Sequence, residues 1–334
     1  EKASTFNIGL DFTMLNQRLD FSFDWYQRTT SDMLVKVEYP EVLGTTAPPA
    51  NKAELRTRGW EVSVKWNDRI GNDFSYDLGF ILSDSQAEIT KYENPSGTLS
   101  DYYVGQKIGE IWGYETEGFY QSDTDVQNHA DQSKLGANWA PGDIMYKDLD
   151  GNKKINNGSN TLDDHGDLKV IGNTTPRYQY GITANMSYKN VYLNVFFQGI
   201  GKRDFWPSSQ PFWPVATQYY NTQKWFVTDS WSEDNRDAYF ARPIARETKN
   251  QQKQTKYLQD ASYCRLKNLT VGYDFPKSWL SFLHVAKAGV YFSAENLFEF
   301  TNVKGAYDPE AAGKNGTMVY PFQRTYSFGL NVTF

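Results

Sequence analysis

The strand-like segments of this sequence are joined by connections that are alternately short and long. Within each segment apolar and polar residues alternate, as in the last one, where Ser327 and Gly329 separate Tyr326, Phe328 and Leu330. Such alternation gives an extended strand one apolar and one polar face, and it recurs in about nine segments. The pattern predicts short turns near 15–18, 67–72, 188–190 and 276–284, and long loops near 29–56, 89–176, 201–260 and 298–322.

Short turns that alternate strictly with long loops are typical of bacterial outer-membrane barrels, where the turns are periplasmic and the loops extracellular. The sequence has no apolar run of about 18 residues, so a membrane-spanning helix is excluded. Phe, Trp and Tyr make up 16% of the residues, which fits the aromatic girdles of a barrel wall. The alternative is a soluble or surface β-sandwich adhesin, in which a second sheet covers the apolar faces.

The predicted fold is therefore all-β: a transmembrane antiparallel β-barrel segment with long extracellular loops. An odd set of about nine strands would leave an open edge in lipid, where unpaired backbone groups are costly. We therefore expect the chain to form the C-terminal part of a larger barrel.

Charge and residue usage exclude several other classes of protein. The net charge of -6 argues against a nucleic-acid partner, because phosphate binding needs a basic surface. The single cysteine, Cys264, rules out a framework of internal disulfides. The three histidines share no metal-binding spacing, and no serine or cysteine stands in a nucleophile motif. We therefore expect a protein that is not an enzyme.

Seven ordered motifs resemble a known family. They are "VGQKIGEIWGYETEGFYQ" (104–121), "PGDIMYKDLDGNKKIN" (141–156), "IGNTTPRYQYGITANMSYKNVYLNVFFQG" (171–199), "WSEDNRDAYFARP" (231–243), "ASYCRLKNLTVGYDFP" (261–276), "VYFSAENLF" (290–298) and "YDPE" (307–310). Together they resemble the C-terminal half of SusC/RagA-type TonB-linked outer-membrane transporters. The resemblance implies a barrel of about 22 strands, with the plug domain and the N-terminal strands outside residues 1–334. It also implies that "DPE" holds the last extracellular loop.

The resemblance further implies a bacterial outer-membrane location and contact with outer-membrane lipid. Its expected partners are a SusD-like lipoprotein, TonB through the N-terminal part, and a second copy of the transporter–lipoprotein complex. The leading functional hypothesis is import of oligosaccharides, and the alternative is import of oligopeptides, as in the RagA type.

One loop has the spacing of a calcium site, and calcium is the candidate cofactor. Asp148, Asp150 and Asn152 occupy loop positions 1, 3 and 5, followed by Lys154, which can offer a backbone carbonyl, and Asn156. Lys153 stands where an EF-hand has glycine, and Ser159 replaces the terminal glutamate. The alternative is an acidic solvated turn, to which Asp163, Asp164 and Asp167 could add oxygen ligands.

The loop 201–260 is rich in large aromatic side chains. Four tryptophans, Trp206, Trp213, Trp225 and Trp231, are candidates for contact with a ligand or a partner. The alternative is that they pack against one another within the extracellular loops.

Overall fold

The computed structural model describes residues 1–36, 48–209, 211–216, 221–281, 284–305, 307–312 and 322–334. Within these residues one antiparallel sheet of nine strands dominates the molecule. Its strands are β1 (Lys2–Met14), β2 (Leu19–Val35), β3 (Ala50–Ile70), β4 (Phe74–Lys91), β9 (Arg177–Tyr188), β10 (Val191–Lys202), β13 (Tyr263–Asp274), β14 (Lys287–Thr301) and β15 (Thr325–Thr333), in that spatial order. The predicted strand number is confirmed.

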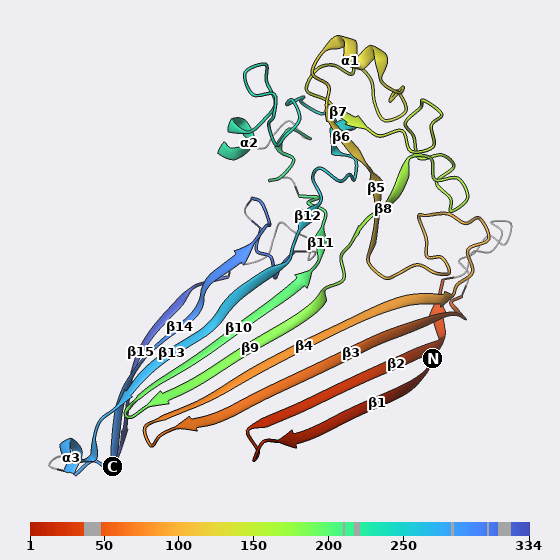
Figure 1. The fold of residues 1–334 in the computed structure, drawn as a ribbon. Helices are drawn as coiled ribbons and strands as arrows, with labels where there is room; N and C mark the ends of the chain where they lie inside the picture. Colours follow the sequence, from red (N-terminus) through yellow and green to blue (C-terminus); the bar gives the residue numbers. More distant parts are fainter. Residues whose placement is uncertain (37–47, 210, 217–220, 282–283, 306, 313–321) are drawn as a thin grey trace.

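The two kinds of connection lie at opposite ends of the sheet. Figure 1 shows the short turns together at one end, with the C-terminus, and the long segments at the other, with the N-terminus. β2, β3 and β4 have 17, 21 and 18 residues, more than the roughly 10 needed to cross a bilayer. They extend past the alternating pattern, so the first long loop is shorter than the predicted 29–56. In the outer parts of β3 and β4 the row that is apolar further down carries charges, as in the Arg56–Glu88 ion pair at 3.4 Å, and this break in the alternation hid them from pattern analysis.

The register carries the apolar and polar faces unbroken across all nine strands. One row of directly paired residues is wholly apolar: Met14, Leu19, Trp66, Leu78, Ala184, Val195, Leu269, Ala294 and Tyr326. The next row, one residue along each strand, points to the opposite face. It contains Thr13, Asp20, Lys65, Gly79, Thr183, Phe196, Asn268, Glu295 and Thr325.

The apolar face is open within the described residues. On β15, Phe328 is 84% exposed and Leu330 65% exposed. In a β-sandwich a second sheet would cover such side chains, but all nine long strands belong to a single sheet. The sandwich alternative is therefore wrong.

Most of the shorter elements lie in the long loops. Three small antiparallel pairs join β5 (Glu110–Tyr114) to β8 (Leu168–Asn173), β6 (Thr116–Phe119) to β7 (Ile144–Tyr146), and β11 (Asp204–Phe205) to β12 (Gln259–Asp260). In the part of the chain that the structure describes, the helices are α1 (Asp123–Asn128) and α2 (Lys224–Thr228) in the long loops and α3 (Lys277–Leu280) in the short turn between β13 and β14, and 3-10 turns lie at Pro214–Ala216 and Lys249–Gln251. Among the described residues, none of the helices has the length and apolar character that crossing a membrane requires.

Candidate functional site

The polar face of the sheet carries a groove of about 460 Å³. In the β2–β3 register Asp24 lies directly opposite Glu61, and neither carboxylate has an ion-pair partner among the described residues. The lining also includes amides and hydroxyls, among them Gln179, Gln198 and Ser83, beside apolar side chains such as those of Ile81 and Phe196. Two like charges in opposed positions repel each other and any approaching anion. The groove therefore suits a neutral polar or a cationic solute.

A second groove, of about 800 Å³, lies nearer the short turns. Its charges are partly paired, since Lys65 Nζ lies 3.2 Å from an Asp77 carboxylate oxygen and Arg18 Nη1 lies 3.3 Å from Asp68. The polar face is thus charged along β2 to β4. Along β13 to β15 it is mainly lined by hydroxyls, amides and glycines.

Tyr192 and Tyr291 on the polar face each cover a glycine of a neighbouring strand, as Tyr26 covers Gly59. Tyr192 is paired with Gly272, and Tyr291 with Gly329. A Cβ atom at Gly272 would lie 2.1 Å from the Tyr192 ring, and one at Gly329 would lie 2.2 Å from the Tyr291 ring. Glycine is therefore required at both positions for the rings to rest on the neighbouring strand. The sequence analysis missed these pairs, because the partners are distant in the chain.

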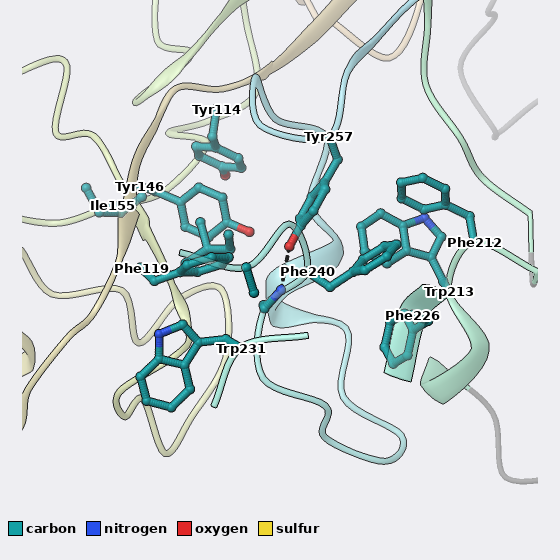
Figure 2. Close-up of a cluster of buried hydrophobic side chains, with 13 residues drawn as sticks. Tyr114, Phe119, Tyr146, Ile155, Phe212, Trp213, Phe226, Trp231, Phe240 and Tyr257 are labelled. Atoms are coloured by element: carbon teal, nitrogen blue, oxygen red, sulfur yellow. Dashed lines mark hydrogen bonds between the residues drawn. The ribbon is translucent and has the colours of Figure 1, made fainter. Parts of the chain in front are cut away.

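Residues 110–173 and 204–260 together form a second compact region, here called the loop unit, above one end of the sheet (Figure 1). Its core is mostly aromatic. Figure 2 shows Tyr257 between Tyr146 and Trp213, and the Tyr257 hydroxyl accepts a hydrogen bond from the Ala241 N–H at 2.7 Å. Tyr146 and Tyr257 are fully buried, and burial raises the pKa of both phenols well above the usual value. They remain neutral, so the two segments share one uncharged aromatic core.

A buried ionic cluster also joins the two segments. Asp143 is fully buried and accepts hydrogen bonds from Arg242 Nε, Arg242 Nη2 and Asn250 Nδ2, each at 2.9 Å. Lys249 Nζ lies 2.9 Å from the same carboxylate. Burial acts to raise the pKa of Asp143, but the bonds from Arg242, Asn250 and Lys249 outweigh it and hold that pKa below its usual value. Asp143 lies in the "PGDI" motif, yet its partners come about 100 residues later and could not be paired with it from sequence.

The four predicted tryptophans pack in or against the core of the loop unit. Trp213 and Trp231 are 8% and 9% exposed, while Trp206 and Trp225 are partly buried against the core. The indole N–H of Trp213 donates to the Pro207 carbonyl at 2.7 Å. In this arrangement the rings of Trp213 and Trp231 are covered by protein. All four therefore take part in packing within the loops, and contact with a ligand or a partner stays a prediction.

The candidate calcium loop brings three carboxylates together. Oxygens of Asp148, Asp150 and Asp167 lie within 4.8 Å of one another, and Asp167 is fully buried. Asp167 holds the loop closed, because its two oxygens accept the N–H groups of Leu149 at 2.7 Å and Asn156 at 2.9 Å.

The remaining predicted ligands make bonds within the loop. The side-chain oxygen of Asn152 accepts the Lys154 N–H at 2.7 Å, and that of Asn156 accepts the Gly158 N–H at 2.6 Å. The Lys154 carbonyl accepts a bond from the Asn156 side chain at 3.0 Å. Carboxylates are the ligands that calcium prefers, so the donor set fits this ion. Calcium binding stays a prediction.

The "DPE" motif is bound to the sheet by a buried arginine. Arg265 on β13 is 1% exposed, and its Nη1 and Nη2 donate to Glu310 at 2.5 Å and to Asp308 at 2.7 Å. Lys267 Nζ adds a contact of 3.1 Å to Glu310. These bonds hold residues 308–310 against the wall, as the sequence analysis expected for this motif.

Comparison with known proteins supports these observations. No protein-family model matches the chain. The chain is 30% identical to TonB-dependent receptor P3 of Formosa agariphila and 27% identical to TonB-dependent receptor SusC of Bacteroides thetaiotaomicron, in each case along its full length. It spans about a third of these relatives, 34% and 32% of their lengths.

The fold also matches solved structures. The chain is similar to one chain of the RagAB peptide transporter, with a TM-score of 0.74 and 24% sequence identity. The match covers 99% of this chain and 35% of that chain. The nine-strand sheet and the loop unit are therefore arranged as in a section of that barrel.

Proposed function

We propose, from the relationship of the whole chain to TonB-dependent receptors of the SusC and RagA type, that it supplies wall and mouth to an outer-membrane importer of oligosaccharides. The remaining strands of the barrel would come from sequence outside these residues. The plug and the element on which TonB pulls would lie there too. The imported solute would pass along the polar face of the nine strands.

One observation carries the proposal: the register keeps one face apolar and the other polar across all nine strands. An exposed apolar face of this extent suits lipid, and a polar inner face suits a hydrated solute. The loop unit lies at the end of the sheet where the long connections gather, so it would border the extracellular mouth (Figure 1).

The lining supports a neutral polar substrate. Hydroxyl and amide groups can bond to the hydroxyls of a sugar, and the unpaired Asp24 and Glu61 carboxylates can accept from them. The proposed partner is a SusD-like lipoprotein that docks on the loop unit. A polar oligopeptide could meet the same groups, and it is the alternative substrate.

The experiment compares uptake by cells that carry or lack the full-length receptor. Labelled oligosaccharides and labelled oligopeptides are supplied separately, with and without a protonophore that removes the energy for TonB. Energy-dependent oligosaccharide uptake only in cells with the receptor is the expected result. Uptake of oligopeptides alone would replace the substrate assignment, and uptake of neither would overturn the importer proposal. Mass spectrometry of the purified complex would identify the copurifying lipoprotein.

A further inference from the structure

Residues 307–312, here called the strap, lie over the polar face of the sheet. Arg265 pairs in the register with Gln198, which lines the polar groove, so the Arg265 side chain is on that face. The bonds from Arg265 to Asp308 and Glu310 therefore fasten the strap to the polar side of the wall.

The other side of the strap packs on the loop unit. The ring centroid of Tyr307 lies 5.3 Å from that of Phe205 and 6.3 Å from that of Phe212. The hydroxyl of Tyr307 shares a hydrogen bond with that of Ser209. Ala312 is 2% exposed and packs in one cluster with Phe205. The wall contact described above is thus one half of a bridge between the sheet and the loop unit.

The two halves of this bridge differ in chemistry. Toward the loop unit the strap buries apolar side chains, and separating them would expose apolar surface to water. Toward the wall its contacts are ion pairs, and the carboxylates of Asp308 and Glu310 are only partly buried. Such carboxylates can return to water, but the buried Arg265 cannot, because a lone buried charge is costly. Release of the strap from the wall therefore requires another partner for Arg265.

A third carboxylate lies within reach of Arg265. Glu299 is its register partner on β14, and Glu299 Oε2 lies 3.8 Å from Arg265 Nε. That distance is too long for a hydrogen bond, and Nε makes none within the described residues. The guanidinium therefore has a donor left over for Glu299 when the strap leaves.

We propose that Arg265 is the fastening point of a releasable strap. Bound to Asp308 and Glu310, it holds the loop unit against the wall. Bound to Glu299 instead, it frees the strap, which then moves with the loop unit away from the polar face. In the importer proposed above this movement widens the entrance, and only that consequence rests on the proposed function.

Amide hydrogen exchange in the full-length receptor tests the strap. The double variant Asp308→Asn, Glu310→Gln keeps the shape of both side chains and removes their charge. We expect the amides of β11 and β12, where Phe205 contacts the strap, to exchange about tenfold faster than in the wild type, because local opening becomes easier. The strands β13 and β14 should exchange as in the wild type. Faster exchange confined to residues 307–312 would overturn the proposal, because the strap would then hold only itself.

The variant Glu299→Gln tests the second arrangement. Without this carboxylate the buried Arg265 has only the strap as a charged partner within the described residues, so we expect β11 and β12 to exchange more slowly than in the wild type. Glu295→Gln is the matched control, since Glu295 is on the same strand and forms no ion pair with Arg265. Exchange as fast in Glu299→Gln as in the wild type would reject the change of partner.

The variant Tyr307→Ala cuts the bridge at its other end. It removes the ring that packs on Phe205 and Phe212, so β11 and β12 should again exchange faster. Residues 308–310 should stay protected, because their ion pairs with Arg265 remain. Loss of protection at residues 308–310 would show that the wall does not hold the strap by itself, and it would also overturn the proposal.

The uptake assay described above separates this inference from the proposed function. If the wild type imports neither class of solute, the proposed function fails, and the exchange rates still decide whether the strap is releasable. If the wild type imports either class, Glu299→Gln should import more slowly than Glu295→Gln, because the strap opens less often. Equal uptake by these two variants would exclude a role of the strap at the entrance.

Discussion

At the residue scale, the outer face of β15 tests whether the wall meets lipid. Phe328 is 84% exposed and belongs to the apolar face. An arginine at the bilayer midplane of a barrel costs about 2–4 kcal/mol. We expect Phe328→Arg and Leu330→Arg to impair assembly of the full-length receptor, measured as the loss of its heat-modifiable band in outer-membrane fractions. Asn331→Gln, on the polar face, should assemble normally. Normal assembly of both arginine variants would contradict the orientation of the sheet.

A second residue-scale prediction concerns the glycine beneath a tyrosine ring. In Gly272→Ala the new methyl would collide with Tyr192, so we expect a loss of about 1–3 kcal/mol, typical of overpacking. Removing the ring in Tyr192→Ala should make the same glycine substitution harmless. The measurement is the urea midpoint of refolded receptor for the wild type, both single variants and the double variant. Additive losses would exclude the contact as the cause.

At the scale of elements, Asp143 gives the loop unit a pH dependence. Its pKa is lower in the folded state, so the folded protein binds fewer protons than the unfolded one and stability rises with pH. The contribution of Asp143 is complete above the ordinary carboxyl pKa of about 4 and is lost as the pH falls below it. We expect pepsin to cleave the loop unit increasingly through that window.

The variant Asp143→Asn tests the same cluster at neutral pH. It leaves Lys249 and Arg242 without their carboxylate, at a cost of about 3–5 kcal/mol for a broken buried ion pair. Its loop unit should be cleaved readily by trypsin at pH 7, and its cleavage by acid protease should depend less on pH. Asp163→Asn, at an exposed position, is the matched control.

A further prediction at the scale of elements concerns calcium binding by the acidic loop. If Asp148, Asp150 and Asp167 hold calcium, added calcium should slow proteolysis at residues 148–167, and a chelator should restore it. Asp150→Asn should remove the calcium effect, because it removes a ligand at an exposed position, whereas Asp163→Asn should keep it. Equal cleavage of the wild type with calcium and with chelator would exclude the ion.

Strands and loops differ in how far the sequence predicts them. The strands can be predicted because each residue of the wall faces either the apolar or the polar side, so neighbouring residues alternate in polarity. The loop unit shows no such alternation between neighbouring residues. Tyr146 donates a hydrogen bond to the Lys249 carbonyl at 2.7 Å, and Asp143 accepts one from Arg242. The sequence around Tyr146 and Asp143 contains no pattern that indicates these distant partners. The sequence therefore shows that the loop is rich in tryptophan, but it does not show that these tryptophans pack in a core shared with residues 110–173.

At the scale of the whole molecule, we expect the two segments of the loop unit to unfold together when either is removed. Deleting residues 207–257 removes Trp213, Phe240 and Tyr257, on which the first segment packs. We expect the sheet to assemble in this variant while residues 110–173 become sensitive to protease, and the lipoprotein to be lost from the purified complex. Replacing residues 71–72, in the short turn between β3 and β4, is the control, since they lie outside that core and at the other end of the sheet. A protected first segment in the deletion variant would show that it folds alone.

The shared core also imposes an order on biogenesis. Its two halves lie on either side of β9 and β10 in the chain, and the Tyr146–Lys249 bond closes a separation of 103 residues. Contacts of such long range form late, after the intervening chain has been confined. We therefore expect the hairpin β9–β10 to form before the first segment buries its aromatic side chains against the second segment. Until then the rings of the first segment stay exposed.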